Sequence, residues 1–129
     1  MARRILMVDD DPDLVMATQT LLEANGFEVD VAHNGQDAID VLAAGREYCL
    51  FIVDAMMSTL TEGFELVHHL RGQPATAKVP LIMLTSIEQQ LGADFAKGED
   101  AETLMLDAFL RKPVEPEELL DEIGKVLGG

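Results

Sequence analysis

Short apolar runs divide this chain, and two of them end abruptly at acidic residues. Residues 5–8 are followed by Asp9 and Asp10, and residues 50–53 are followed by Asp54. Short apolar runs without polar alternation are typical of strands that are covered on both faces, as in a parallel sheet. Such a sheet needs helices on both of its sides, so the pattern indicates an α/β fold.

Helix signals fall between these strand-like runs. Asp11 can cap a helix that has Pro12 at its first position, and the pair Asn25-Gly26 can end that helix. The pattern then predicts an edge strand over 27–31, a helix from 35 to near 45, a helix over 63–70, strands over 79–84 and 108–110, and a last helix from 116. Five β/α units predict a doubly wound parallel sheet of five strands in the order 2-1-3-4-5.

Size and charge restrict the class of protein. At 129 residues, the chain is long enough for one domain with a single sheet core, and its formal net charge of −15 disfavours binding to nucleic acid or to an anionic membrane. No apolar stretch approaches the length of a membrane span, and the start of the chain does not resemble a signal peptide. The single cysteine, Cys49, excludes an internal disulfide and favours a reducing compartment. We therefore expect one cytoplasmic domain over residues 1–129.

Polar residues close the other predicted strands as well. Thr85 follows the run 81–84, and Lys112 follows the last short strand. Because ligands of open α/β sheets bind in the crevice beyond the carboxyl ends of the strands, the three acids, the hydroxyl and the ammonium should share that crevice. Three carboxylates repel one another unless a cation joins them, and oxygen ligands suit Mg²⁺. This set of groups can also accept a phosphoryl group on a carboxylate and neutralise its oxygens.

In these motifs the chain resembles the receiver domain of two-component response regulators, and the similarity covers essentially its whole length. The residues that carry it are Val8-Asp9-Asp10-Asp11-Pro12, Asp54 with Met56-Met57, Gly63-Phe64-Glu65-Leu66, Leu84-Thr85-Ser86 and Lys112-Pro113. The resemblance implies a flavodoxin-like receiver fold. Because the chain stops soon after its last predicted helix, we expect a stand-alone receiver of the single-domain, chemotaxis-regulator type.

The resemblance also implies a phosphoacceptor and a metal site. Asp54 would take a phosphoryl group from the phosphohistidine of a sensor kinase. Mg²⁺ would be bound directly by Asp10, by Asp54 and by the backbone carbonyl of Met56. Asp9 would act on the ion through a coordinated water molecule. We therefore expect Mg²⁺ as the cofactor.

Three further residues receive roles from the resemblance. Lys112 would pair with the phosphoryl oxygens, and a cis Lys112–Pro113 bond would orient it. Thr85 would donate its hydroxyl to the phosphoryl group. Phe109 would change rotamer as Thr85 moves, so that the two residues act together as a switch.

Two segments depart from the family pattern. Ser58 stands where most relatives have proline, and the loop that contains it is about one residue longer. The segment 87–106 lacks the usual Gly-Ala-Asp before the last strand. For that segment we expect a loop over roughly 89–98, followed by a short helix.

Partners and alternatives complete the sequence-based interpretation. The partners would be a sensor histidine kinase or a phosphotransfer protein, together with an unknown downstream protein effector, and neither nucleic acid nor membrane. One alternative is a receiver-like adaptor that does not depend on phosphorylation, which the intact set of five site residues disfavours. The other is an aspartate-nucleophile phosphohydrolase of the haloacid dehalogenase type, in which Asp9 and Asp11 would be the paired acids. That alternative is disfavoured because the chain has no cap domain and places Asp54 on a different strand.

Overall fold

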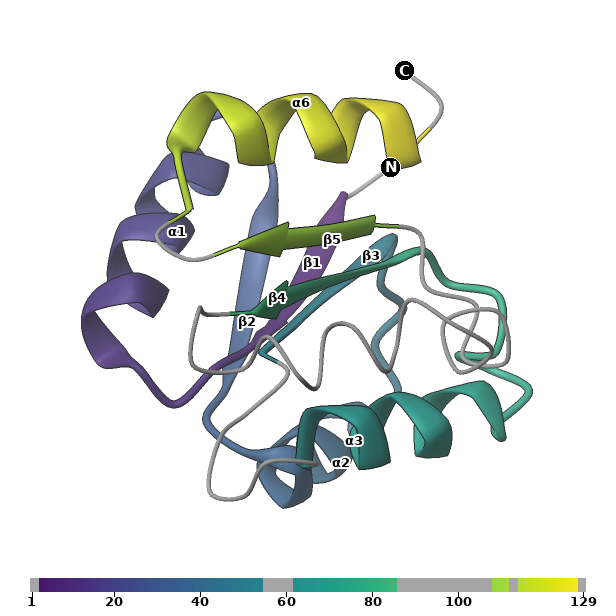
Figure 1. The fold of residues 1–129 in the computed structure, drawn as a ribbon. Coiled ribbons are helices and arrows are strands. Elements are labelled where there is room, and N and C mark those ends of the chain that lie inside the picture. Colours follow the sequence, from purple (N-terminus) through teal and green to yellow (C-terminus); the bar gives the residue numbers. More distant parts are fainter. Residues whose placement is uncertain (1–2, 55–61, 86–107, 112–113, 128–129) are drawn as a thin grey trace.

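The computed structural model describes residues 3–54, 62–85, 108–111 and 114–127 (Figure 1). Within this part, one parallel sheet contains the strands β1 (Arg4–Val8), β2 (Glu28–Ala32), β3 (Leu50–Asp54), β4 (Leu81–Thr85) and β5 (Ala108–Arg111). The strands lie in the order β2-β1-β3-β4-β5, and every neighbouring pair is parallel. The predicted strand order is therefore confirmed.

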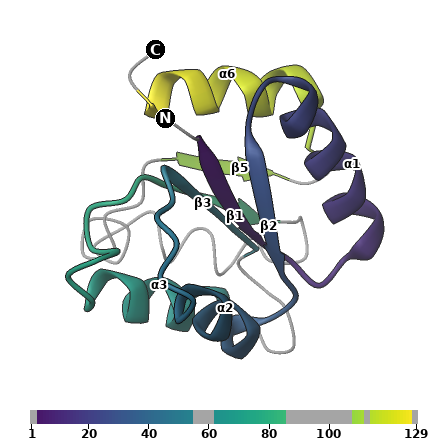
Figure 2. The ribbon, with the colours of Figure 1, turned by 180° about the vertical axis from the view of Figure 1, so that it is seen from behind.

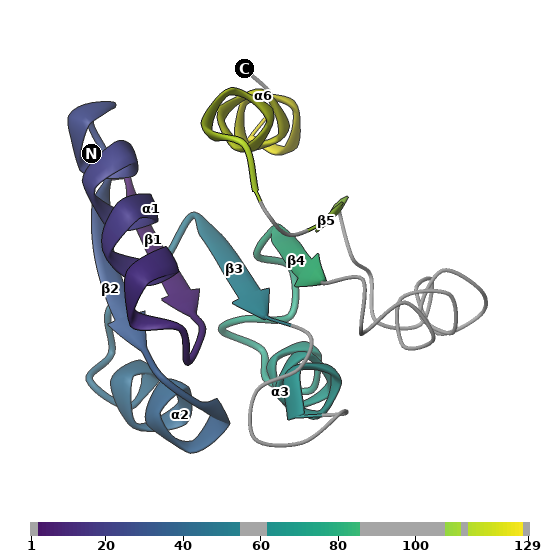
Figure 3. The ribbon, with the colours of Figure 1, turned by 60° about the vertical axis from the view of Figure 1, so that its left-hand side comes forward.

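Helices cover both faces of this sheet. The described helices are α1 (Pro12–Ala24), α2 (Gly35–Leu42), α3 (Glu62–Arg71) and α6 (Pro116–Val126). α1 and α6 lie on one face, and α2 and α3 lie on the other, as the views from the front, back and side show (Figures 1, 2 and 3). This three-layer arrangement is the α/β fold that the apolar runs predict.

The central strands have buried side chains on both faces. On β1, Ile5 and Met7 pack into the core beneath α1 and α6, whereas Leu6 and Val8 pack into the core beneath α2 and α3. All four are at most 1% exposed. The absence of polar alternation in this run reflects its burial on two sides.

The ends of the helices follow the expected local signals. Asp11 caps α1 with Pro12 in the first turn, and Gly26, which follows the end of α1, has a φ of 90°. Asn34 caps α2 through the backbone N–H of Asp37. Gly45, with a φ of 84°, lies shortly after this helix. Both glycines adopt the left-handed conformation that other residues enter only at a cost.

The fourth strand starts two residues later than predicted, at Leu81 rather than Val79. Pro80 has no amide hydrogen with which to continue a strand ladder. Its carbonyl still accepts a hydrogen bond of 2.9 Å from the backbone N–H of Phe51. The connection from α3 to β4 is held by Arg71, whose Nη1 donates to the carbonyls of Thr76, Ala77 and Val79.

Two further expectations concern the segment 87–106 and membrane spans. The prediction of a loop and a short helix between residues 87 and 106 lies outside the described residues. Among the described helices, none combines the length and the apolar character that crossing a bilayer requires.

Candidate functional site

Three carboxylates come together where β1 and β3 end. Val8 and Val53 are paired in the register of these neighbouring strands, so the residues that follow them, Asp9 and Asp54, emerge side by side. One oxygen each of Asp9, Asp10 and Asp54 lies within 4.8 Å of the others. Asp9 and Asp54 are buried, whereas Asp10 is exposed. The predicted convergence of the three acids is confirmed.

The turn after β1 orients Asp9. Its carboxylate Oδ1 accepts a hydrogen bond of 3.0 Å from the backbone N–H of Asp11, and its own N–H donates to the carbonyl of Ala32 at 3.1 Å. The Asp11 carboxylate in turn accepts from the N–H groups of Asp13 and Leu14, in the first turn of α1. This last contact is a helix N-cap, which satisfies amide donors that have no partner inside the helix.

The donor chemistry of the cluster fits a hard divalent cation. All three side chains offer carboxylate oxygens, two of them come from buried positions, and the charges repel one another at these separations. Mg²⁺ favours such a site, because it binds through one or two protein carboxylates and retains several water ligands. The carboxylate oxygens of the cluster are therefore suitable ligands for Mg²⁺.

The structure locates only part of the rest of the predicted site. Thr85 is the last residue of β4, paired in register with Arg111, and Phe109 is paired with Met83 in the middle of β5. Both therefore have the strand positions that the sequence predicted, although their side chains lie outside the described part of the structure. Met56 and Lys112, and with them the predicted cis peptide bond, also lie outside the described residues.

A second polar cluster, which the sequence analysis did not predict, surrounds Asp30 on β2. The Asp30 carboxylate accepts hydrogen bonds from Arg4 at 3.1 Å, from Arg46 at 3.1 and 3.2 Å, and from the Tyr48 hydroxyl at 2.7 Å. Burial alone would raise the pKa of Asp30, but Tyr48, Arg46 and Arg4 together bring it below its ordinary value. Burial and the Asp30 carboxylate raise the pKa of Tyr48.

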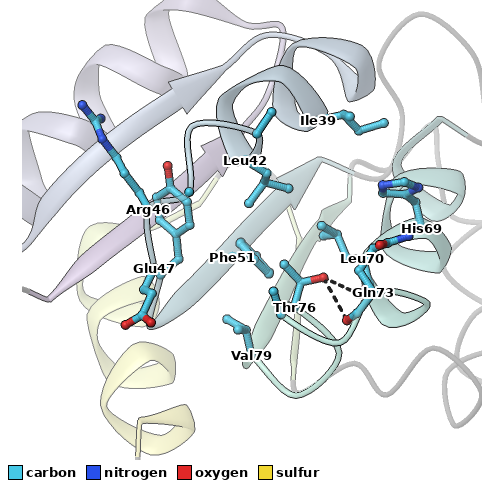
Figure 4. Close-up of a pocket in the computed structure, with 14 residues that line it drawn as sticks. Ile39, Leu42, Arg46, Glu47, Phe51, His69, Leu70, Gln73, Thr76 and Val79 are labelled. Carbon is cyan, nitrogen blue, oxygen red and sulfur yellow. Dashed lines mark hydrogen bonds between the residues drawn. The ribbon is translucent and has the colours of Figure 1, made fainter.

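A cavity of about 650 Å³ lies between α2, α3 and β3, on the face of the sheet that α2 and α3 cover (Figure 4). Its lining includes Leu42 from α2, Phe51 from β3 and Leu70 from α3, with Thr76 from the following connection. The Thr76 hydroxyl donates to the carbonyl of Leu70, so it is already engaged by the backbone. None of the three clustered carboxylates lines this cavity.

The three histidines lie at the surface. His68 and His69 are exposed on α3, and His33 lies in the exposed turn before α2, where its N–H donates to Asp37 at 2.9 Å. Cys49 is half-buried, and burial raises the pKa of its thiol. These residues give no sign of a second metal site among the described residues.

The parallel sheet order and the acidic cluster at the ends of β1 and β3 define a receiver-type α/β domain. The chain belongs to the response regulator receiver domain family, which matches residues 5–124. It is similar to Protein PilH of Pseudomonas aeruginosa, with 32% identity over 126 residues that cover 98% of each chain. The transcriptional regulatory protein CpxR of Escherichia coli is 36% identical over 124 residues, which cover 96% of this chain and 49% of that protein.

A solved structure agrees with this assignment. The chemotaxis response regulator CheY4 of Vibrio cholerae superposes with a TM-score of 0.81 at 27% identity, over 98% of this chain and 99% of that one. The chain spans about half the length of several curated relatives that it matches, CpxR included.

Proposed function

We propose that this chain is a phosphoacceptor switch in which Asp54 takes a phosphoryl group from a histidine kinase. The observation that carries the proposal is the convergence of Asp9, Asp10 and Asp54 at the ends of two adjacent strands. A carboxylate oxygen of Asp54 attacks phosphorus while the bond from phosphorus to the donor nitrogen breaks, and the electron pair of that bond returns to the imidazole. The product is an acyl phosphate on Asp54.

The remaining groups hold the reactants and neutralise charge. Asp10, Asp54 and the Met56 carbonyl would hold Mg²⁺, and Asp9 would hold it through a water molecule. Bound there, the ion would neutralise charge on the transferred phosphoryl oxygens. Lys112 neutralises a further oxygen. Family membership and the clustering of the three acids support this assignment.

Signal output depends on a change of surface rather than on turnover. The Thr85 hydroxyl hydrogen-bonds to the phosphoryl group, and Phe109 follows it to a new rotamer. Their places near the end of β4 and within β5 support a coupled movement of the two, because these strands are neighbours. The surface around β5 then changes its affinity for a partner protein.

The partners that suit this role are proteins. A sensor histidine kinase or a phosphotransfer protein supplies the phosphoryl group, and a protein effector reads the phosphorylated state. We place these events in the cytoplasm. The chain would act there as a single receiver domain over residues 1–129. The formal net charge of −15 supports a role that involves neither nucleic acid nor a membrane surface.

Incubation with acetyl phosphate and Mg²⁺, followed by mass spectrometry of the intact protein, tests the proposal. We expect one phosphoryl group on the wild-type chain, none on Asp54→Asn, and none when EDTA removes the metal. Asp40→Asn, which changes an exposed acid on α2, is the matched control and should be phosphorylated normally. An adaptor would gain no phosphoryl group, and a hydrolase would release phosphate from p-nitrophenyl phosphate continuously.

A further inference from the structure

Asp11 contacts the acidic cluster without belonging to it. Its backbone N–H donates to Oδ1 of Asp9, while its side chain accepts hydrogen bonds from the N–H groups of Asp13 and Leu14. One residue thus joins a carboxylate of the cluster to the first turn of α1. The proposed function gives Asp11 no role.

We propose that Asp11 is a positioning residue for the metal site. Its side-chain cap on α1 fixes the direction of the N–H that holds the Asp9 carboxylate. This inference rests on the proposed function, because it concerns how the acidic cluster binds Mg²⁺. It assigns the side chain of Asp11 a role in metal affinity that is separate from its negative charge.

The α1 helix is a rigid anchor for this contact. Val15, Thr18 and Leu22 are at most 6% exposed, and Val15 and Leu22 pack into the core beneath α1 and α6. The Asp11 carbonyl also accepts a hydrogen bond of 3.0 Å from the N–H of Val15, inside the first turn. With its side chain and its carbonyl both tied to α1, Asp11 is held at φ −90° and ψ 105°.

The held N–H restricts Asp9, the buried member of the cluster that directly follows β1. A carboxylate can rotate about its last side-chain bond, and a charge-assisted hydrogen bond to one oxygen limits that rotation. Asp9 is fully buried, so its oxygens must already point correctly when the ion arrives. Groups that orient metal ligands in this way typically change metal affinity by about 10–100-fold when they are lost.

Two substitutions separate the cap from the charge. Asp11→Asn and Asp11→Ala both remove one negative charge, but asparagine caps helices about as well as aspartate and alanine does not. Titration calorimetry with MgCl₂ should give a dissociation constant about tenfold weaker for Asp11→Ala than for Asp11→Asn. In the metal-free proteins, the amide of residue 11 should exchange with solvent faster in the alanine variant.

Two further variants separate positioning from stability. Asn34→Ala removes the corresponding cap from α2, through a residue outside the acidic cluster. It should lower the melting temperature without changing Mg²⁺ affinity. Glycine adopts the backbone conformation of a helix N-cap with little loss of stability, but it has no side-chain oxygen to accept a hydrogen bond. The Asp11→Gly variant should therefore bind Mg²⁺ as weakly as Asp11→Ala.

The outcomes are distinct. Equal Mg²⁺ dissociation constants for Asp11→Ala and Asp11→Asn, with normal binding by the wild type, would overturn this inference alone. Affinity that follows melting temperature across all four variants would overturn it too, because the cap would then act through stability only. If the wild type bound no Mg²⁺, the proposed function and this inference would both fail.

Discussion

Asp10 is the exposed member of a cluster whose other two carboxylates are buried, so it contributes charge without contributing to the core. Two like charges about 4 Å apart repel by about 1 kcal/mol even in bulk water. We therefore expect Asp10→Asn to raise the melting temperature of the metal-free protein by about 3–5 °C. Thermal unfolding followed by circular dichroism, with and without MgCl₂, measures the change.

The metal and a neighbouring acid provide the controls for this prediction. Saturating MgCl₂ should reduce or reverse the advantage of Asp10→Asn, because the ion removes the repulsion in the wild type and binds the variant less well. Asp13→Asn changes an exposed acid in the first turn of α1, where negative charge is favourable, so it should not stabilise. Destabilisation by Asp10→Asn without metal would show that the acids do not repel one another.

At the residue scale, the sequence predicted those contacts that depend only on where a residue lies along its strand. Asp9, Asp10 and Asp54 could be brought together because parallel strands share one carboxyl edge. The cluster around Asp30 could not be predicted, because its partners lie 16 to 26 residues away and depend on how side chains pack. For this segment the sequence predicted only an edge strand over 27–31.

At the scale of elements, the Asp30 cluster connects three parts of the chain: β1, β2 and the connection from α2 to β3. The pKa of Asp30 lies below its ordinary value of 3.8. The ionised carboxylate therefore adds stability above about pH 4, and this stability is lost as the pH falls through the lowered pKa. Asp30→Asn should cost about 1–3 kcal/mol at pH 7.

Urea unfolding of the wild type and Asp30→Asn between pH 7 and pH 2.5 measures this dependence. The difference between the two proteins should be constant above pH 5 and should shrink below pH 4. Glu28→Gln is the control, because Glu28 is more than half exposed and forms its ion pair with Arg4 at the outer end of the cluster. A difference that stayed constant down to the lowest pH would mean that the charge of Asp30 does not stabilise the fold.

The extents of the elements follow from local chemistry where a cap or a proline sets them. Asp11 and Asn34 start helices as their side chains require, and Gly26 follows the end of α1. The start of β4 was predicted too early, because apolar character alone does not show where strand pairing begins. Pro80 was the available signal, since it cannot donate to a ladder.

On the scale of the whole molecule, charge is the dominant feature. The chain has 24 acidic and 9 basic residues, so self-repulsion opposes the compact state. Raising the ionic strength from about 0.01 M to about 0.1 M shortens the screening length from about 30 Å to about 10 Å. We expect the urea midpoint to rise over this interval.

The choice of salt distinguishes screening from ion binding. Tetramethylammonium chloride has a cation too large for the acidic cluster, and it should stabilise the protein as well as NaCl does. If only NaCl raised the midpoint, binding at a specific site would be the cause. A midpoint that fell in both salts would show that the surface ion pairs outweigh the repulsion.

The Asp30 cluster also affects association between copies of the protein. β2 is an outermost strand, and such a strand leaves a row of backbone donors and acceptors to which a foreign strand can add. Here Arg4, Glu28, Asp30 and Arg46 place four charges on or beside that strand. A strand that docked there would have to strip water from these ion pairs, which is costly. The same contacts that hold β2 to the sheet therefore protect this acidic protein against growth into edge-to-edge polymers.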